Sequence, residues 1–369
     1  MRLLEQHEDS VAFAWETPYL TAALPGVGGL LRAELEDFVV EEVPAYAPCG
    51  EGEHTFFAVE KRNLSTPRLV EAIASALGIS PRDISYAGLK DARAVTRQIF
   101  SVQWLSPETL LGLQLENAQV LWATRHTNKL RVGHLRGNRF TIRIRELHPE
   151  ALARATAILN TLAQRGVPNG YGVQRFGNDG RNAEIGLLLL RNDRAGLRAR
   201  GIHHLSFWQH RFYLSALQSE LFNRYLAERL QRGLLDTVLV GDVAKKHATG
   251  GMFTVESAEV DSLRAQAGEI SATGPIYGFK MWSPQGEMAT LEAEILAAAG
   301  LKLADFQPAK LKGSRRPVRY MPEGLAWRSE GDALVVEFFA PKGAFATMLL
   351  RELMKSDVEL DEADDAEED

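Results

Sequence analysis

The chain has little cysteine and no long apolar run. Cys49 is its only cysteine, so no intramolecular disulfide can form and a disulfide-stabilised secreted domain is excluded. The longest aliphatic run, from Leu187 to Leu190, is far shorter than the roughly 20 residues that cross a bilayer. The stretch from Met1 to Asp9 turns acidic where a secretory signal needs apolar residues. We therefore expect a protein of the reducing cytoplasm with no membrane partner.

The usual cofactor motifs are also missing. No glycine-rich loop ends in Gly-Lys-Ser/Thr, and the glycine cluster at 26–29 does not follow a strand-like run, as a dinucleotide-binding loop would. His203, His204 and His210 cluster in the sequence, but no carboxylate or thiol at ligand spacing completes a metal site there. We expect neither a cofactor nor a metal ion.

Charge is unevenly distributed along the chain. The 42 lysines and arginines against 48 aspartates and glutamates give a formal charge of −6. From Asp357 to Asp369 there are nine acidic residues and no basic one, so the remaining 42 basic and 39 acidic residues carry +3. The body of the chain is slightly basic, and we expect residues 356–369 to form a disordered acidic tail.

Two dense groups of cations lie in that body. Between Arg125 and Arg145 the chain has seven cations, two histidines and Phe140 but no acid, and a second group runs from Lys310 to Arg319. One such group alone would indicate a solvated strand face. Two segregated groups with interleaved aromatic side chains are typical of proteins that bind phosphate backbones and stack on bases, so the pattern predicts nucleic-acid binding.

The order of elements indicates an α+β fold interrupted by a second domain. Residues 29–46 and 96–104 read as strands, and a helix is predicted from Thr66, which can cap it, to Gly78. Helical spacing over 206–232 and glycine-rich punctuation follow, and then strand alternation returns at 333–339. Strands, then a helical and loop-rich block, then strands again predict one domain inserted into another.

One carboxylate lies in a setting suited to chemistry. Asp91 follows Gly88-Leu89-Lys90 in a predicted loop between a helix and a strand, with Arg93 and Arg97 close behind it. A turn residue is the simpler interpretation. The functional one is a carboxylate that neighbouring cations keep ionised, which can then act as a nucleophile.

Several motifs, in order along the chain, resemble those of the tRNA pseudouridine synthase D (TruD) family. Residues 87–96, Ala-Gly-Leu-Lys-Asp-Ala-Arg-Ala-Val-Thr, closely resemble the family's A-G-x-K-D-[KR]-x-A-V-T signature, with the basic residue one place later. The other matches are residues 31–42 to the P-E-D-F-x-V-x-E strand, 137–140 to G-N-x-F, 167–177 to V-P-N-Y-F-G-x-Q-R-F-G, 215–223 and 273–278 to motifs of the inserted domain, and 341–353 to L-P-x-G-S-[FY]-A-T…R-E-L.

This resemblance implies a fold and its boundaries. The fold class is α+β: a pseudouridine synthase catalytic domain with a mixed, mainly antiparallel, bifurcated sheet, plus an inserted family-specific α+β domain. Residues 1–190 and 315–355 would form the discontinuous catalytic domain. Residues 191–314 would form the inserted TRUD domain.

It also implies roles at single positions. Asp91 matches the essential aspartate, acting either as the nucleophile at C1′ or as the base that generates a glycal. Arg32 stands where the family carries a lysine and would be the cation paired with Asp91; arginine keeps the charge. Phe140 matches the aromatic residue that stacks on the target base, and it has no phenol with which to donate a proton.

Further positions are expected to support the site or to bind RNA. Asn138 would hold the catalytic loop or the flipped nucleotide, and Phe345 matches a second aromatic residue near the base. Phe38 and Lys90 lie within matched motifs and would support the site. The expected RNA-binding side chains are Arg93, Arg97, Lys129, Arg131, Arg136, Arg139, Gln174, Arg175, Arg315 and Arg316.

The implied activity is the isomerisation of a uridine to pseudouridine in transfer RNA, with uridine 13 as the family's typical target. No cofactor is implied, because the reaction is redox-neutral and transfers no external group. We expect a monomer without an obligate protein partner. Two other functions remain open: a non-catalytic protein that binds or folds structured RNA on the same scaffold, and an RNA glycosylase in which water captures C1′.

Overall fold

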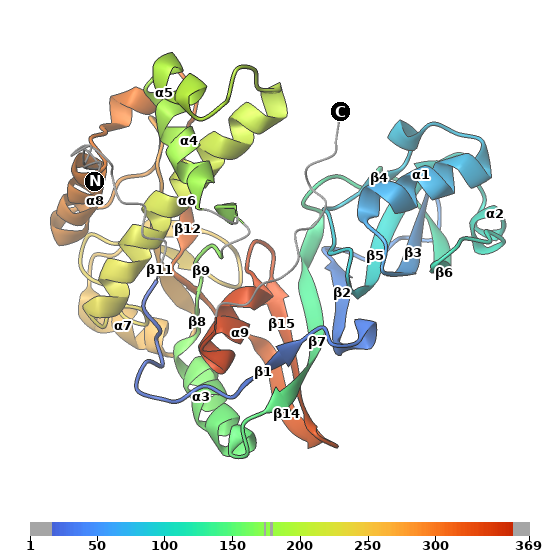
Figure 1. Ribbon diagram of the computed structural model, residues 1–369, viewed down its shortest axis with the longest axis horizontal. Helices are drawn as coiled ribbons and strands as arrows, with labels where there is room; N and C mark the ends of the chain where they lie inside the picture. The colour runs from blue at the N-terminus through green and yellow to red at the C-terminus, as the bar shows by residue number, and fades with distance from the viewer. Residues whose placement is uncertain (1–16, 173–174, 178–179, 357–369) are drawn as a thin grey trace, which may run out of the picture. The chain divides into compact units, whose positions relative to one another are not determined.

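The computed structural model describes residues 17–172, 175–177 and 180–356 (Figure 1). Contacts divide the chain into two compact units. The sheet unit comprises Ala23–Ala163 and Met321–Asp369, and the insert unit comprises Met1–Ala22 and Gln164–Tyr320. The predicted acidic tail, apart from Ser356, lies outside the described residues.

The insert unit is longer than the predicted inserted domain, residues 191–314, because its flanks pack with it. Strand β8 (Val167–Pro168) pairs with β13 (Arg319–Tyr320), which joins the two ends of the Gln164–Tyr320 segment. Helix α4 (Arg181–Leu190) packs along α6 (Phe207–Gln231). The segments just outside 191–314 therefore associate with the helical block rather than with the sheet unit.

The sheet unit is built on nine strands in the order β14-β15-β7-β2-β5-β3-β6, with β1 paired to β7 and β4 paired to β5. Strands β2 and β5 run parallel and the other described pairs in this sheet run antiparallel, so the predicted α+β class with a mixed, mainly antiparallel sheet is confirmed. The strands are β1 (Gly28–Leu31), β2 (Phe38–Pro44), β3 (His54–Arg62), β4 (Ser85–Tyr86), β5 (Val95–Gln103), β6 (Ala118–His126), β7 (Leu135–Leu147), β14 (Glu323–Glu330) and β15 (Ala333–Pro341). The helices are η1 (Leu35–Asp37), α1 (Thr66–Leu77), η2 (Pro81–Asp83), α2 (Pro107–Leu111), α3 (Ala151–Arg165), which ends inside the insert unit, and α9 (Ala346–Met354).

Helix α1 has the predicted bounds, but not the predicted cap. Gly78 ends it in the left-handed region, with φ of 66°, as a residue without Cβ allows. The N-cap is Ser65, and Thr66 is the first helical residue. The Thr66 hydroxyl is buried against β5, where it donates a 3.0 Å hydrogen bond to Oε1 of Gln98.

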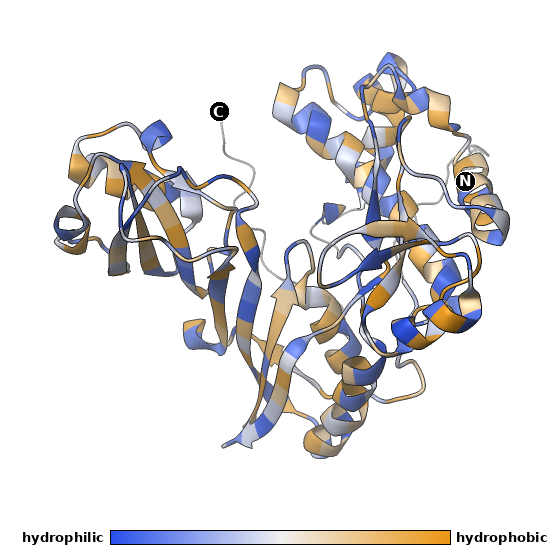
Figure 2. Ribbon diagram, turned by 180° about the vertical axis from the view of Figure 1, so that it is seen from behind, coloured by the Kyte–Doolittle hydropathy of each residue, from blue (hydrophilic) through white to orange (hydrophobic). Residues whose placement is uncertain are grey.

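Alternation along β3 and β5 sends neighbouring side chains to opposite faces of the sheet. Phe57 and Phe100 pack with α1 on one face. Phe56 and Ile99 pack on the other face, together with Ala87, the residue that begins the Asp91 loop. Figure 2 shows hydrophilic and hydrophobic residues alternating along the strands. The sheet core therefore holds the start of that loop.

The insert unit has a core around α6, where Leu217, Leu221, Phe222 and Tyr225 are fully buried. Its four-stranded sheet has the order β10-β9-β11-β12. Its remaining elements are α5 (Arg194–Ala199), β9 (Val243–Lys246), β10 (Met252–Thr254), α7 (Ala258–Gln266), β11 (Ile270–Ile276), α8 (Gly286–Ala298), η4 (Leu303–Phe306) and β12 (Ser314–Pro317).

Candidate active site

The loop that carries Asp91, between β4 and β5, is fixed by buried polar side chains. Oγ1 of Thr66 accepts the Lys90 N–H at 3.1 Å while donating to Gln98, and Nε2 of Gln98 donates to the Gly88 carbonyl at 2.5 Å. Thr66 and Gln98 have no exposed surface. One closed chain of hydrogen bonds therefore holds the backbone on the N-terminal side of Asp91, and an ordered loop is what precise positioning of a carboxylate requires.

Lys61 of β3 holds Asp91 itself. Its ammonium donates a 2.8 Å hydrogen bond to the Asp91 carbonyl and another to the Leu64 carbonyl, and the side chain is completely buried. Burial lowers the pKa of Lys61 to about 8, although the negative charge of Asp91 opposes the shift. Lys61 was not among the predicted site residues. The alternation along β3 puts this lysine on the same strand face as buried Phe57 and Val59, and that pattern could have predicted its burial.

Arg32 faces the Asp91 carboxylate. Its Nη2 lies 3.6 Å from Oδ2 of Asp91, and the Arg32 side chain is 4% exposed whereas that of Asp91 is 29% exposed. The guanidinium also lies 4.2 Å from the centre of the Phe38 ring, a distance suited to a cation–π contact. Arg93 donates a 3.1 Å hydrogen bond to the Arg32 carbonyl. The structure thus brings Asp91, Arg32, Phe38 and Arg93 together.

A second ion pair fixes the turn after Arg32. Nε and Nη2 of Arg145 each donate a 2.8 Å hydrogen bond to the carboxylate of Asp37, which also accepts the Glu34 N–H. Asp37 is fully buried. Burial alone would raise the pKa of Asp37, but the hydrogen bonds from Arg145 and Glu34 hold it below its ordinary value. This pair, which the sequence analysis did not identify, anchors the start of β2, where Phe38 lies.

Lys90 forms a buried ion pair within the sheet unit. Its Nζ lies 2.6 Å from Oε2 of Glu42, and both side chains are buried. Glu42 is opposite Asn138 in the register of β2 and β7. Oδ1 of Asn138 is buried and has no hydrogen-bond partner among the described residues. The geometry therefore assigns the charge of Lys90 to Glu42, and it leaves Asn138 with an acceptor atom available for another group.

The aromatic residues of the sheet form one stacked group. Phe140 packs against Phe338 with ring centres 5.2 Å apart and against the edge of Phe38 at 6.2 Å, and it is 7% exposed. Phe338, on the adjacent strand, was not predicted. Phe345 is the N-cap residue of α9 and is 39% exposed, so a large part of its ring can meet a ligand.

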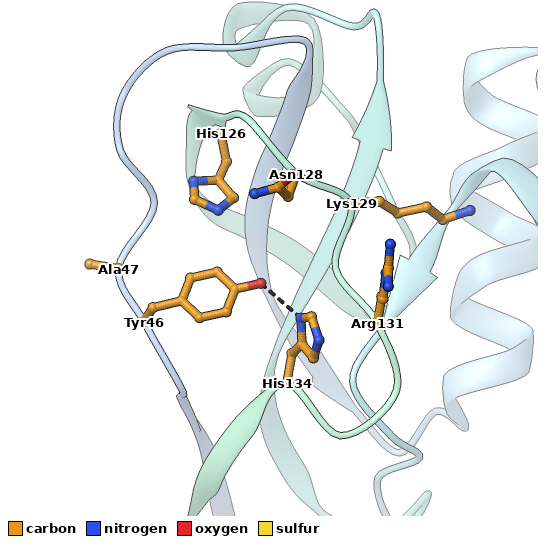
Figure 3. Close-up of a pocket in the computed structure, with 7 residues that line it drawn as sticks. All are labelled: Tyr46, Ala47, His126, Asn128, Lys129, Arg131 and His134. Atoms are coloured by element: carbon orange, nitrogen blue, oxygen red, sulfur yellow. Dashed lines mark hydrogen bonds between the residues drawn. The ribbon is translucent and has the colours of Figure 1, made fainter.

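The expected RNA-binding residues of the sheet unit are exposed, and several of them are ion-paired. Arg97 pairs with Glu60 at 2.9 Å, Arg136 with Glu323 at 2.5 Å, and Arg139 lies 3.9 Å from Glu41. Lys129 and Arg131 line a pocket beside Tyr46 and two histidines, with no carboxylate partner in the described part of the chain (Figure 3). Arg93 is also exposed.

In the insert unit the expected RNA-binding residues differ in accessibility. Arg315 is buried, lies 2.7 Å from Oε1 of Glu292 and donates to Thr273. Its side chain is only 1% exposed, so the structure offers no surface for an RNA phosphate, contrary to our expectation for Arg315.

Arg316 and Arg175 are partly exposed. Arg316 donates to Asn169 at 2.9 and 2.7 Å and lies 4.2 Å from the centre of the Tyr171 ring. Nε of Arg175 donates to the Ser219 hydroxyl at 3.3 Å. Gln174 lies outside the described residues.

A metal-binding cluster and a membrane-spanning helix are both absent from residues 17–172, 175–177 and 180–356. Within them, no three or more His, Cys, Asp or Glu side chains are grouped so that they could hold a metal ion. No helix in the same ranges has both the length and the apolar character that crossing a membrane requires.

Comparison with known proteins places this arrangement in a family. The family model described as "tRNA pseudouridine synthase D (TruD)" matches residues 14–200 and 198–353. A tRNA pseudouridine synthase D of Thermus thermophilus is 47% identical over 340 residues, 92% of each chain, and that of Geobacter sulfurreducens is 41% identical, covering 92% of this chain and 97% of the relative. A crystal structure of a Methanosarcina mazei protein assigned as tRNA pseudouridine synthase D shares the fold, with a TM-score of 0.74 at 24% identity over 92% of this chain and 96% of that one. The chain belongs to the tRNA pseudouridine synthase D (TruD) family.

Proposed function

We propose that this chain, a tRNA pseudouridine synthase by family, converts uridine 13 of transfer RNA to pseudouridine with the Asp91 carboxylate as the reacting group. The observation that carries the proposal is the setting of Asp91. Its carboxylate is partly exposed and faces the guanidinium of Arg32 at 3.6 Å, while Lys61 holds its backbone. A reacting carboxylate must be reachable and fixed, and this arrangement meets both needs.

The reaction exchanges bonds within one nucleotide. The N1–C1′ bond breaks, the uracil turns, C5 bonds to C1′, and the proton on C5 leaves while N1 gains one, so no other reagent is consumed. Asp91 acts either by attack on C1′ or by removing a ribose proton to give a glycal, and both routes begin with an ionised carboxylate. The guanidinium of Arg32 faces that carboxylate at 3.6 Å.

The aromatic group gives the detached uracil a surface. Phe140 lies between Phe38 and Phe338, so its ring orientation is set by the sheet core rather than by the ligand. A flat, rigid ring suits a base that must turn without leaving. Phe38 links this ring to Arg32, which faces Asp91. The free Oδ1 acceptor of Asn138, two residues earlier on β7, can take a hydrogen bond from the nucleotide.

The substrate must expose its uridine. A base in folded RNA is stacked, so reaction at C1′ requires the nucleotide to be flipped out, with exposed cations holding the flanking phosphates. Asp91, Arg32, Lys61 and Phe140 all belong to one unit of one chain, which supports action as a monomer without a protein partner.

The test is pseudouridine formation in unmodified tRNA. Wild type, Asp91→Asn and the control Asp332→Asn, an exposed aspartate in the β14–β15 turn, are incubated with a tRNA transcript, and pseudouridine is mapped by carbodiimide modification. We expect pseudouridine at position 13 with wild type and the control, and none with Asp91→Asn, which should still bind tRNA. A transcript with cytidine at position 13 should stay unmodified.

The outcomes separate the three functions. RNA binding without pseudouridine in any wild-type sample would support the non-catalytic protein. Release of free uracil would support the glycosylase. Full activity in Asp91→Asn would leave the family activity standing but overturn the role of Asp91.

A further inference from the structure

Two loops of the sheet unit line a pocket outside the buried core of the sheet. Its lining comes from the loop after β2, with Tyr46 and Ala47, and from the end of β6 and the loop that follows, with His126, Asn128, Lys129, Arg131 and His134 (Figure 3). The cavity volume is about 560 Å³, within the range of small-molecule sites.

The two cations of this pocket are uncompensated. The exposed arginines nearby on the sheet have carboxylate partners, as Arg97 and Arg136 do. Lys129 and Arg131 form no ion pair with any carboxylate of the described ranges, although both are exposed. Leu130 between them is buried, and its N–H donates to the Ser101 hydroxyl at 3.0 Å. The fixed residue Leu130 is therefore flanked by two cations without carboxylate partners, Lys129 and Arg131. Two such cations close together suit the binding of a phosphate.

Rings form the opposite side of the pocket. The hydroxyl of Tyr46 is hydrogen-bonded to Nδ1 of His134 at 2.8 Å, and the Tyr46 ring stacks on His126 at 5.3 Å (Figure 3). Nδ1 of His126 in turn accepts the Cys49 N–H at 3.2 Å. Tyr46 is 36% exposed, so part of a ring already held in place can meet a planar ligand. Preorganised aromatic surface beside positive charge is what an unstacked nucleotide needs.

The pocket is joined to the catalytic loop. The Gly133 N–H donates a 2.7 Å hydrogen bond to the carbonyl of Ala87, four residues before Asp91. Leu130 and Ala87 also belong to the same buried cluster. The loop with the two cations and the loop with Asp91 are therefore attached to each other through the backbone and through the core.

We propose that this pocket binds one nucleotide of the substrate RNA next to the target uridine. Lys129 and Arg131 hold its phosphate, Tyr46 and His134 support its base, and the Asn128 amide is placed to read the base edge. The proposal rests on the proposed function and adds a second nucleotide site to it.

The experiment compares KM and kcat for an unmodified tRNA transcript. The variants are Tyr46→Ala, Tyr46→Phe and the double change Lys129→Gln with Arg131→Gln. The control is Arg328→Gln, an exposed arginine on β14, at the other end of the strand order from β6, which pairs with Glu337 at 2.7 Å. Thermal unfolding of each variant verifies that it is folded.

We expect KM to rise at least fivefold in Tyr46→Ala and in the double variant, with kcat within twofold, because the pocket holds no reacting atom. Tyr46→Phe, which keeps the ring, and Arg328→Gln should stay within twofold of wild type. In an Asp91→Asn background, the double variant should lower the salt dependence of tRNA binding, d log K/d log[salt], by about one to two units.

Other outcomes overturn the proposal in distinct ways. If the double variant raises KM but Tyr46→Ala does not, the pocket holds only a backbone phosphate and no nucleotide. If neither changes KM, the pocket takes no part in RNA binding and any partner it has is of another class. If wild type forms no pseudouridine, the proposed function is wrong. The salt dependence of tRNA binding in the Asp91→Asn background then tests separately whether the pocket binds RNA.

Discussion

Lys61 donates a 2.8 Å hydrogen bond to the backbone carbonyl of Asp91, while Arg32 faces the carboxylate of the same residue at 3.6 Å. Two cations therefore contact different parts of Asp91, one its backbone and the other its side chain. The cation on the backbone is completely buried and fixes the position of the residue, and the cation near the side chain faces the partly exposed carboxylate. Substituting them should accordingly have different consequences.

For Lys61 we predict a pH-dependent contribution to stability. Burial lowers its pKa from 10.5 to about 8 in the folded chain, so between these values the folded state has released a proton that the unfolded state still holds. The free energy of unfolding should then rise with pH from about 8 to about 10, by up to about 3 kcal/mol. Urea titrations of wild type and Lys61→Met over this range would measure the difference.

The matched control for that prediction is Lys302→Met, at an exposed lysine of the insert unit. It should keep the wild-type pH dependence, whereas Lys61→Met should lose the rise. Equal slopes in wild type and Lys61→Met would show that Lys61 keeps an ordinary pKa in the folded chain.

For Arg32 we predict that the positive charge of the side chain matters more for kcat than its shape. Arg32→Met should lower kcat roughly hundredfold, since the Asp91 carboxylate loses its neighbouring cation. Arg32→Lys should keep most of the activity, because lysine keeps a positive charge beside Asp91. Single-turnover rates with saturating tRNA would measure both, and an Arg32→Met enzyme as fast as Arg32→Lys would contradict the pairing.

For Phe140 we predict an effect on activity beyond its packing. Phe140→Leu should destabilise the fold by about 1 to 2 kcal/mol and lower kcat/KM at least tenfold, because the ring that we propose stacks on the uracil is lost. Phe100→Leu removes a fully buried ring on the α1 side of the sheet and should cost similar stability without that loss. Equal activities of the two variants would make Phe140 a core residue only.

Sequence patterns predicted the helices and strands better than they predicted which polar side chains pair with one another. Alternation and capping residues located α1 and the strands because backbone preferences are local, and the loop of Asp91 was found from its own residues. What they could not show is which cation meets which carboxylate. Lys90 is next to Asp91 in the sequence but pairs with Glu42, whereas Lys61 is thirty residues away and binds the Asp91 backbone. Such partners depend on strand register, which no local pattern fixes.

Arg315 is the clearest example of this limit, and we predict a purely structural role for it. Arg315→Met should destabilise the chain by about 3 to 5 kcal/mol, since it leaves the buried carboxylate of Glu292 without its partner. The double variant with Glu292→Met should recover part of the loss. The salt dependence of tRNA binding should not change at temperatures where the variants are folded; a slope lowered by about one unit would restore Arg315 as a phosphate contact.

For residues 357–369 we predict an effect on binding selectivity and none on catalysis. The family match ends at residue 353, before the nine acidic residues, so deletion should leave kcat for tRNA unchanged. The rest of the chain carries +3, and an attached anionic segment competes with RNA for its cations. Deletion should therefore tighten binding to an unrelated single-stranded RNA at low salt, with the difference fading as salt screens the charges. Replacing the nine acids by their amides should act as deletion does, because charge and not length is the cause. Loss of pseudouridine formation on deletion would instead make the segment part of the enzyme.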